Sequence, residues 1–340
     1  MVSKLGLFKV GLAGCGQVAH KHVMALRQLP GAILSGVYDP DLDRAETFSR
    51  RYNIPYFTSY QDLLASGIDA VAICSPSWLH ASMGIEAAEK GIHVVVEKPM
   101  ALTLEEADNL IAACEDNKVV LTVVLQNRFK PAVKLLRSAV EAGRFGKLSH
   151  GSAIVRWNRN REYYLNNPWR ERKELGGGAL INQAIHNLDL LLWMMGSPSS
   201  VFAYTANRVS PGSAEDLAVG IIRFKNGALG TIEVSSSIYP RNLEESLAIF
   251  GEKGTAVLSG TTASTIKTWI FEDGLRDDLG LKDQEFKGHL EVYQDFLRAV
   301  RRGEKPFVDG REGRKSLALI LALHESALTK REVVLSEWEV

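Results

Sequence analysis

The feature that most constrains this fold is an alternation, within the first 125 residues, between short apolar runs and segments with helical periodicity. The apolar runs lie at 7–13, 32–38, 68–74, 92–96 and 119–124, and segments such as DLDRAETFSRRY and SMGIEAAEKG separate them. Strands that are apolar on both faces and joined by helices form a parallel sheet covered on both sides. The pattern therefore predicts an α/β fold, with a doubly wound parallel sheet in a first domain at residues 1–125.

The pattern changes after residue 125. Helices are expected at 131–143, 177–195, 288–302 and 311–330, and strand-like runs lie near 200–209, 216–225, 227–237 and 243–259. The pair Asn226-Gly227 between two alternating runs is a hairpin signal. We therefore expect a second α/β domain, residues 126–340, with an open and mainly antiparallel sheet.

Composition excludes several classes of partner. The chain carries 40 Lys and Arg against 40 Asp and Glu, so no overall field favours nucleic acid or an anionic membrane. No apolar run reaches the roughly 20 residues needed to span a bilayer. The stretch LAGC at 12–15 resembles a lipoprotein processing site, but Lys9 interrupts the apolar segment before it, so we expect a strand there. Widely spaced cysteines in apolar contexts predict small core residues in a reducing cytoplasm: Cys15, Cys74 and Cys114.

A glycine-rich turn follows the first expected strand. In KVGLAGCGQVAHKH, the residues Gly14, Gly16 and Ala19 form the pattern G-x-G-x-x-A at the start of an amphipathic helix, with Gln17 and Val18 inside it. Gly14 suits the tight turn, Gly16 lets a pyrophosphate approach the bare backbone, and Ala19 keeps the helix close to the sheet. The turn predicts a dinucleotide site, with a purely structural glycine turn as the alternative.

A carboxylate ends the second expected strand. Asp39 follows AILSGVY, 23 residues after Gly16. At this place a carboxylate accepts hydrogen bonds from the adenosine ribose and repels a 2′-phosphate, which favours NAD over NADP. The alternative for Asp39 is a cap on the next helix, which begins in PDLDRAE.

Charged residues end another strand, where HVVVEKPMAL runs three valines into Glu97, Lys98 and Pro99. Ligands of doubly wound sheets lie at the carboxyl ends of the strands, so we expect the segments CSPSWLH and EKP beside the nicotinamide. The expected cofactor contacts there are Ser75, Pro76, His80, Glu97 and Lys98. Lys98 is suited to stabilise a developing alkoxide, and a cis Lys98-Pro99 bond would fix the turn. A solvated Glu97–Lys98 ion pair is the alternative.

The helix in GGGALINQAIHNLDLLLWMMG carries Asn182, His186 and Asp189 at i, i+4 and i+7, on one face of an otherwise apolar element. Polar groups on a buried stripe need partners or a ligand. His186 is suited to take a hydroxyl proton, and Asn182 to orient it or to bind substrate. A structural histidine is the alternative. The glycine triplet 176–178 indicates a close approach of the backbone to something at the start of the helix.

Arginines and aromatic residues are interleaved in VRWNRNREYYLNNPWRERKELGGG, residues 155–178. Arginine forks and aromatic faces suit a phosphorylated or carboxylated sugar and a stacked base. We expect Arg128, Arg156 and Tyr163 at the substrate, and Gln126, Trp169 and Arg170 at the cofactor and the adjoining sugar. A loop that covers a subunit sheet is the alternative, and the short stretch in a neutral chain disfavours nucleic acid.

No metal is expected. His20 and His22 are two residues apart on a helix and point to different faces, and no His/Cys/Asp cluster has ligand spacing. The chain also lacks the Ser-His-Asp order and the nucleophile elbow of hydrolases.

Together, GLAGCGQVAHKH, CSPSWLH, EKP and GGGALINQAIHNLDLL resemble the glucose-fructose oxidoreductase, inositol dehydrogenase and MocA (Gfo/Idh/MocA) family over essentially the whole chain. The resemblance implies a Rossmann domain, a C-terminal domain that packs in dimers or tetramers, and oxidoreduction of pyranoses or cyclitols. The family's motif lysine falls on Lys98 and its helix histidine on His186. Many members carry Asp four residues before that histidine. This chain has Asn182 there, which leaves His186, with Lys98, as the expected base.

Within the family, VLQNRFKPAV, YYLNNPWR and NQAIHNLDLLLWMMG resemble the UDP-N-acetylglucosaminuronate 3-dehydrogenases. This resemblance implies NAD-dependent oxidation of the C3 hydroxyl of a UDP-sugar acid. We therefore expect a cytoplasmic, homo-oligomeric sugar dehydrogenase without nucleic-acid or membrane partners. The next substrates to consider are an inositol or a free pyranose, and the rival from another class is a non-catalytic nucleotide sensor on this fold.

Overall fold

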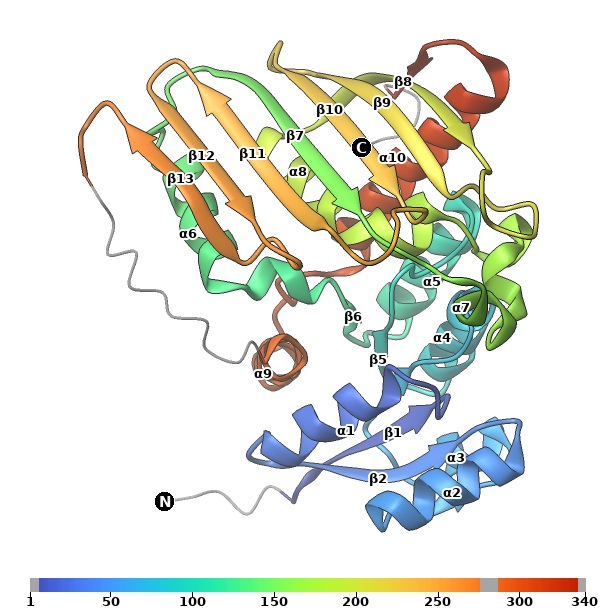
Figure 1. Ribbon diagram of the computed structural model, residues 1–340. Helices are drawn as coiled ribbons and strands as arrows, with labels where there is room; N and C mark the ends of the chain where they lie inside the picture. The colour runs from blue at the N-terminus through green and yellow to red at the C-terminus, as the bar shows by residue number, and fades with distance from the viewer. Residues whose placement is uncertain (1–5, 276–286, 336–340) are drawn as a thin grey trace. The chain divides into compact units, whose positions relative to one another are not determined.

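The computed structural model describes residues 6–275 and 287–335, which form two compact units (Figure 1). Within these residues, unit 1 comprises 6–126 and 287–314, and unit 2 comprises 127–275 and 315–335. The first boundary lies one residue from the expected position. The structure departs from the expected division at residues 287–314, which pack with the first unit although they follow the second along the chain.

Unit 1 contains a six-stranded parallel sheet in the order β3-β2-β1-β4-β5-β6. Its strands are β1 (Phe8–Ala13), β2 (Ala32–Tyr38), β3 (Tyr56–Phe57), β4 (Ala70–Ile73), β5 (His93–Val96) and β6 (Leu121–Val123). Every residue of β4 is buried, because helices cover both faces. The strand order reverses between β1 and β4, where doubly wound sheets bind their ligands. The predicted parallel sheet is confirmed.

The helices of unit 1 follow the predicted alternation. They are α1 (Ala19–Gln28), α2 (Leu42–Tyr52), α3 (Tyr60–Ala65), the short 3₁₀ turn η1 (Ser77–Leu79), α4 (His80–Glu89), α5 (Leu104–Asp116) and the late α9 (Gly288–Arg302). A capping box of Thr103 and Glu106 begins α5. Helix α4 packs on α5, and α9 packs on α1 (Figure 1). The late segment thereby becomes part of unit 1.

Unit 2 contains an eight-stranded sheet in the order β13-β12-β11-β7-β10-β9-β8-β14. Its strands are β7 (Leu148–Arg156), β8 (Pro198–Ala206), β9 (Leu217–Phe224), β10 (Leu229–Ser235), β11 (Glu244–Gly251), β12 (Gly254–Ser259), β13 (Thr265–Phe271) and β14 (Val333–Val334). Among the described strands of this sheet, only β7 and β10 pair in parallel. The hairpin between β9 and β10 turns at Asn226-Gly227, with Gly227 at φ +87°. The mainly antiparallel sheet and the hairpin are both confirmed.

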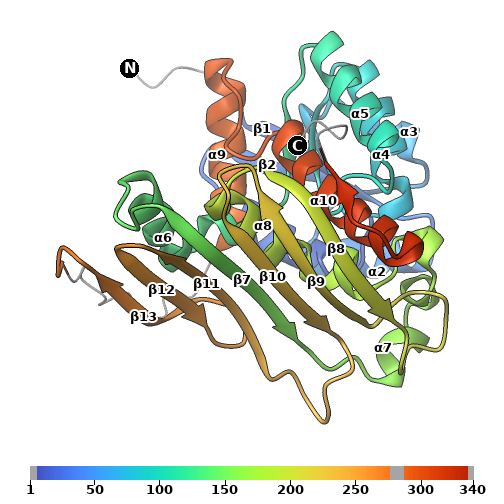
Figure 2. The ribbon, with the colours of Figure 1, turned by 90° about the horizontal axis from the view of Figure 1, so that it is seen from above.

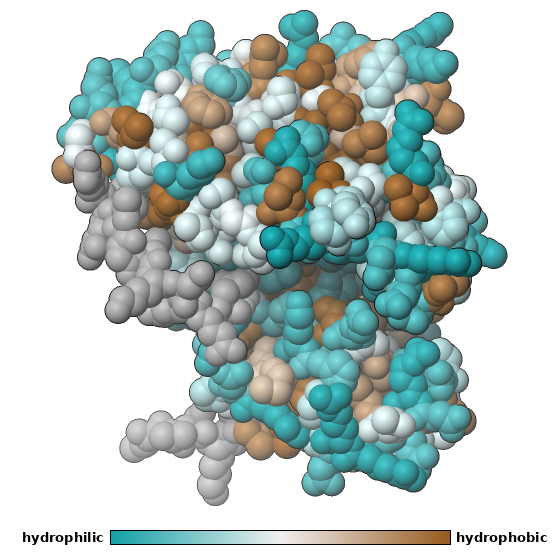
Figure 3. All heavy atoms as spheres, in the orientation of Figure 1, coloured by the Kyte–Doolittle hydropathy of each residue, from teal (hydrophilic) through white to brown (hydrophobic). Residues whose placement is uncertain are grey.

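The helices of unit 2 are η2 (Gln126–Phe129), which begins at the last residue of the first segment of unit 1, α6 (Pro131–Glu141), α7 (Arg161–Leu165), η3 (Pro168–Glu171), η4 (Lys173–Leu175), the π-helix η5 (Ala179–Ala184), α8 (Ile185–Met195) and α10 (Gly310–Thr329), which enters unit 2 at Lys315. Of these, α6, α8 and α10 lie on one face of the sheet (Figure 2). Helix α8 packs on β7 and β11. The opposite face, here called the outer face, exposes four large apolar or aromatic side chains of its strands: Tyr204, Val219, Ile221 and Leu229. Figure 3 shows hydrophobic residues, in brown, scattered among polar ones on the surface that it presents. Among the described residues, no helix is long and apolar enough to cross a membrane.

Candidate functional site

The glycine turn after β1 has the predicted form. Gly14 has φ +100°, and a Cβ there would lie 2.5 Å from the carbonyl oxygen of Cys74 at the end of β4. A Cβ at Gly16 would meet nothing within 4 Å beyond its chain neighbours. Helix α1 begins without a side-chain cap and without an acidic residue in its first turn. Open backbone at the positive end of a helix dipole fits a pyrophosphate. Gln17 is exposed and Val18 half-buried beside it.

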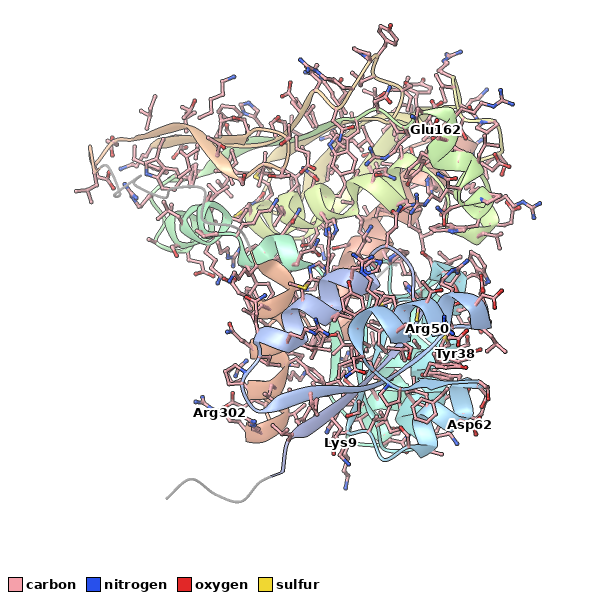
Figure 4. The ribbon with its side chains drawn as sticks, turned by 60° about the horizontal axis from the view of Figure 1, so that its bottom comes forward. Lys9, Tyr38, Arg50, Asp62, Glu162 and Arg302 are labelled. Carbon is pink, nitrogen blue, oxygen red and sulfur yellow. The ribbon has the colours of Figure 1, made fainter. Side chains whose placement is uncertain are left out.

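Asp39 ties the end of β2 to this turn. Its Oδ2 accepts the N–H of Cys15 at 2.8 Å and its Oδ1 accepts the N–H of Asp41 at 3.0 Å, with Arg44 Nη1 at 3.5 Å. The preceding residue, Tyr38, labelled in Figure 4, accepts the Gly14 N–H at 2.7 Å. A carboxylate has about four acceptor positions, so capacity for a ribose remains. The alternative role of Asp39 as a helix cap is wrong, because Asp41 caps α2.

The segment Glu97-Lys98-Pro99 follows β5, and the Lys98-Pro99 bond is cis as predicted. Glu97 is buried, and its Oε2 accepts the Lys98 N–H at 3.2 Å. Its Oε1 lies 3.1 Å from Nε2 of His22 and 3.4 Å from Nε2 of His289. The solvated ion pair is therefore wrong, because Glu97 is buried beside two histidines. Its predicted contact with the cofactor stays a prediction. Lys98 itself is half-buried.

The ligand atoms of His22, Glu97 and His289 lie within 4.8 Å of one another, close enough to hold a metal ion. The sequence argument against a metal compared His22 only with His20, its neighbour on α1. It missed this group because its members are far apart in the chain and no local spacing connects them.

His80 begins α4 and links two strand ends. Its Nδ1 lies 2.7 Å from the carbonyl oxygen of Pro99, and its Nε2 lies 2.8 Å from that of Ser75. Burial lowers the pKa of His80, while the two carbonyls and Glu97 oppose that shift. The buried ring of His80 thus joins the segments that follow β4 and β5, and its predicted cofactor contact stays a prediction. Ser75 and Pro76 are half-buried at the same edge of the sheet.

The polar stripe predicted on the helix of unit 2 divides in two. Asn182 in the π-helix and His186 in α8 are half-buried, whereas Asp189 is 1% exposed. Single π-turns inside α-helices occur frequently at functional sites. Asn182 and His186 thus remain the two candidates for contact with a ligand on this helix.

Asp189 has protein partners. Arg128 donates to it through Nε at 2.8 Å and Nη2 at 2.7 Å, and Ser316 Oγ donates at 2.7 Å. Trp193 stacks on the same guanidinium, with 5.2 Å from Cζ to the ring centroid. These contacts of Arg128 give it a structural role in unit 2, and its predicted contact with substrate stays a prediction.

The backbone of the glycine triplet does lie close to other atoms, as predicted, and these atoms belong to the protein itself. A Cβ on Gly177 would lie 2.3 Å from the carbonyl oxygen of Arg170, and one on Gly178, at φ +120°, would lie 2.5 Å from Glu215 Oε2. Glu215 Oε1 accepts the N–H of Leu180 at 2.9 Å. A buried carboxylate thus fixes the start of the helix that carries the candidate residues.

Two arginines and two aromatic rings form what we call the arginine–aromatic cluster: Arg159, Arg170, Trp157 and Tyr163. Arg159 Nη2 donates to Gln183 Oε1 at 2.8 Å, and Gln183 Nε2 donates to the Tyr163 hydroxyl at 2.5 Å. The guanidinium of Arg170 lies 4.2 Å from the Tyr163 ring centroid. Within the described part of the chain, the buried Nε atoms of Arg159 and Arg170 have no hydrogen-bond partner. Sequence reasoning missed Gln183, which follows Asn182 directly, and did not select Arg159.

Arg156 lies on β7 and forms ion pairs at 2.6 Å with Glu233 and at 3.0 Å with Glu244. The hydrogen bond to Glu233 is the main reason that the pKa of Arg156 is raised. These ion pairs give Arg156 a structural role on the sheet, and its predicted substrate contact stays a prediction. Gln126 and Trp169 are half-buried in 3₁₀ turns, and their predicted roles stay predictions.

Comparison with known proteins gives a consistent result. Residues 8–125 match a family model described as an oxidoreductase family with an NAD-binding Rossmann fold, and residues 133–257 match the GFO/IDH/MocA C-terminal domain. A curated relative, myo-inositol 2-dehydrogenase of Thermotoga maritima, is 28% identical over 97% of this chain and 99% of its own length.

Two solved structures are similar over nearly their full length. The WlbA dehydrogenase from Bordetella pertussis, in complex with NADH and UDP-GlcNAcA, is 37% identical with a TM-score of 0.90, over 96% of this chain and 98% of that one. The WlbA dehydrogenase from Chromobacterium violaceum, with the same two ligands, is 35% identical with a TM-score of 0.91, over 98% of this chain and 99% of that one.

Proposed function

The chain belongs to the Gfo/Idh/MocA oxidoreductases, a family with an NAD-binding Rossmann domain, and we propose that it oxidises C3 of a UDP-N-acetylglucosaminuronate-type nucleotide sugar with NAD⁺. Support comes from the glycine turn, from Lys98 after β5, and from the pair Asn182 and His186. It also comes from the two similar dehydrogenases, whose structures contain UDP-GlcNAcA.

The residues of unit 1 fit the cofactor. The open backbone at Gly16 and the uncapped N-terminus of α1 would hold the pyrophosphate, and Asp39 would accept the ribose hydroxyls. Ser75 and Pro76, after β4, and Lys98, after β5, would flank the nicotinamide. When bound, NAD⁺ supplies the acceptor for the hydride that leaves the sugar carbon.

Side chains of the protein accept the proton of the sugar hydroxyl and stabilise the negative charge on its oxygen. His186 takes the proton of the sugar hydroxyl, because a neutral imidazole is an effective base near neutral pH. The ammonium of Lys98 stabilises the negative charge that develops on that oxygen as the hydride leaves. Asn182, four residues before His186, orients the imidazole or binds the sugar.

The arginine–aromatic cluster is the observation that carries the choice of an anionic sugar. It holds two guanidinium groups whose Nε–H donors lack protein acceptors within the described residues, and it bonds to Gln183, directly after Asn182. A carboxylate or phosphate supplies the acceptors that such donors require. Arg159, Arg170 and Tyr163 would then bind the acidic part of the substrate, and Trp169 would lie beside them.

Inositol or a free pyranose is the second candidate substrate, because myo-inositol 2-dehydrogenase is similar over nearly the whole chain. The two candidates are separated by measuring NADH formation in a single turnover, with enzyme in excess over each of a UDP-sugar acid, an inositol and a free aldose. We expect turnover with the UDP-sugar acid. Turnover with a free cyclitol alone would overturn the substrate, and NAD binding without turnover of any sugar would favour a nucleotide sensor.

The outer face of unit 2 supports a homo-oligomer, a dimer or tetramer in which this face is covered by a second copy. Val219 and Ile221 are 52% and 56% exposed on β9, and Tyr204 is 62% exposed on the adjacent β8. Such apolar neighbours on one sheet face are typical of subunit interfaces. Light scattering should give a multiple of the chain mass, and Ile221→Lys should lower it. We also place the protein in the cytoplasm, because its three cysteines are free and buried.

A further inference from the structure

Lys98 is joined, through its neighbour Glu97, to helices from both ends of unit 1. His22 lies on α1 and His289 on α9, and both present Nε2 to the same oxygen of Glu97. The other oxygen of Glu97 accepts the backbone N–H of Lys98. One carboxylate thereby connects two helices, which are far apart in the chain, to the backbone of the proposed catalytic lysine.

The hydrogen bonds around this carboxylate assign each proton. Burial lowers the pKa of His22, although its hydrogen bond to Glu97 and the charge of Glu97 oppose the shift. A neutral His22 that donates from Nε2 to Glu97 must accept at Nδ1, where the Tyr293 hydroxyl lies 2.7 Å away. Burial raises the pKa of Tyr293, so this hydroxyl keeps its proton and donates it.

Glu97, which accepts the hydrogen bond from His22, stays ionised. Burial by itself would raise its pKa, but the contacts with His22 and His289 outweigh burial and hold the pKa well below its ordinary value. A fixed carboxylate in a buried site needs donors on both oxygens. Here His22 Nε2 donates to one oxygen and the Lys98 N–H to the other, while His289 Nε2 lies 3.4 Å from the first.

Resting on the function proposed above, we propose that His22, Glu97 and His289 form a positioning cluster that holds Lys98 in its catalytic place. Glu97 fixes the backbone of Lys98 on one side. On the other side, the carbonyl of Pro99 is held by His80 at 2.7 Å. The late helix α9 thus contributes to catalysis without contacting the cofactor or the sugar, through His289 and through Tyr293 behind His22.

The test compares this cluster with a second His–Tyr pair on the same helix. His20 Nδ1 lies 2.7 Å from the Tyr52 hydroxyl, the same distance as His22 Nδ1 from Tyr293, and neither His20 nor Tyr52 contacts Glu97. Glu97→Gln replaces one acceptor oxygen with a donor, so it should lower kcat about 100-fold through displacement of Lys98, with KM for NAD changed less than about threefold. Tyr293→Phe removes one hydroxyl and should lower kcat, whereas Tyr52→Phe should not.

A second readout needs no sugar, so it separates failure of this inference from failure of the proposed function. The rate at which acetic anhydride labels Lys98, followed by mass spectrometry, should rise in Glu97→Gln and stay unchanged in Tyr52→Phe, while other lysines label equally in all proteins. Equal kcat and equal Lys98 labelling in Glu97→Gln and wild type would overturn the inference. So would stoichiometric zinc in the purified protein that is lost in Glu97→Gln, because the cluster would then be a metal site.

Discussion

Arg128 and Asp189 form a buried ion pair in unit 2, in which the guanidinium donates through both Nε and Nη2 to the two carboxylate oxygens at 2.8 and 2.7 Å. Their side chains are 3% and 1% exposed. The pair holds the middle of α8, one turn after His186. It fixes the helix that carries the proposed base, His186.

We predict that Asp189→Asn lowers the free energy of unfolding by about 3 kcal/mol, because it leaves a buried guanidinium without its counter-charge. Urea unfolding followed by circular dichroism measures the loss. The control is Glu46→Gln in the exposed pair of Glu46 with Arg50, which should cost less than about 0.5 kcal/mol. If both variants lost the same free energy of unfolding, the buried Arg128–Asp189 ion pair would stabilise the fold no more than the exposed pair does.

Asp39→Asn should raise the ratio of kcat/KM for NADP to that for NAD by about tenfold or more, because it removes the charge that repels a 2′-phosphate. The amide oxygen can still accept the N–H of Cys15. Arg44, at 3.5 Å from Asp39, then becomes available to the phosphate. Adding Arg44→Ala should remove the gain, and an unchanged cofactor ratio in Asp39→Asn would contradict the role of this carboxylate.

Gly178→Ala should destabilise the protein by more than about 2 kcal/mol and lower kcat, because a Cβ would overlap the Glu215 carboxylate in a left-handed backbone. Gly196→Ala is the matched control, since Gly196 has φ +90° but nothing within 4 Å of the new Cβ. It should cost about 1 kcal/mol and leave kcat unchanged. Equal effects on kcat would mean that Glu215 does not place the helix.

Stability should fall below pH 6.5, partly through His93. Its Nδ1 accepts the N–H of Val120 at 2.9 Å, so a proton cannot bind there without breaking that bond. Burial lowers the pKa of His93 from the ordinary 6.5, with Asp69 opposing. As the pH drops through 6.5, His93 takes up a proton in the unfolded chain before it does so in the folded protein. The free energy of unfolding then falls by up to about 1.4 kcal/mol per pH unit. Above pH 6.5 His93 is neutral in both states and causes no such loss.

His93→Asn keeps an acceptor for Val120 and cannot titrate, so it should reduce the slope of unfolding free energy between pH 6.5 and 5. Burial also lowers the pKa values of His22 and His80, so part of the slope remains. Denaturant unfolding at a series of pH values checks this. The same slope in the variant and in the wild type would assign the acid sensitivity to other groups.

The sequence predicted the parallel sheet because each buried strand is a short, uninterrupted apolar run. It predicted α9 almost to the residue. It could not place α9 in unit 1, because periodicity describes the face of a helix and not its partner. Strands β7 and β13 were missed, since half-exposed residues interrupt their apolar patterns. The run 243–259 was expected as one strand, and a turn at 252–253 divides it into β11 and β12.

Site residues with a local signature were easier to find than those with distant partners. Gly14 and Gly16 are explained by backbone geometry within one turn, and the structure confirms that geometry. Arg128 and His80 are polar residues beside functional motifs, and only tertiary contacts reveal that their partners are Asp189 and backbone carbonyls. His22 and Glu97 are 75 residues apart, so spacing in the sequence could not connect them.

The central claim is that Lys98 and His186 carry the oxidation of a UDP-sugar acid. The most direct measurement is single-turnover NADH formation from UDP-N-acetylglucosaminuronate by wild type, Lys98→Ala and His186→Asn, with NAD affinity measured for each protein. The account predicts NADH in the wild type and a loss of about 100-fold or more in both variants, at unchanged NAD affinity. Wild-type rates in either variant, or NAD binding without any turnover in the wild type, would contradict it.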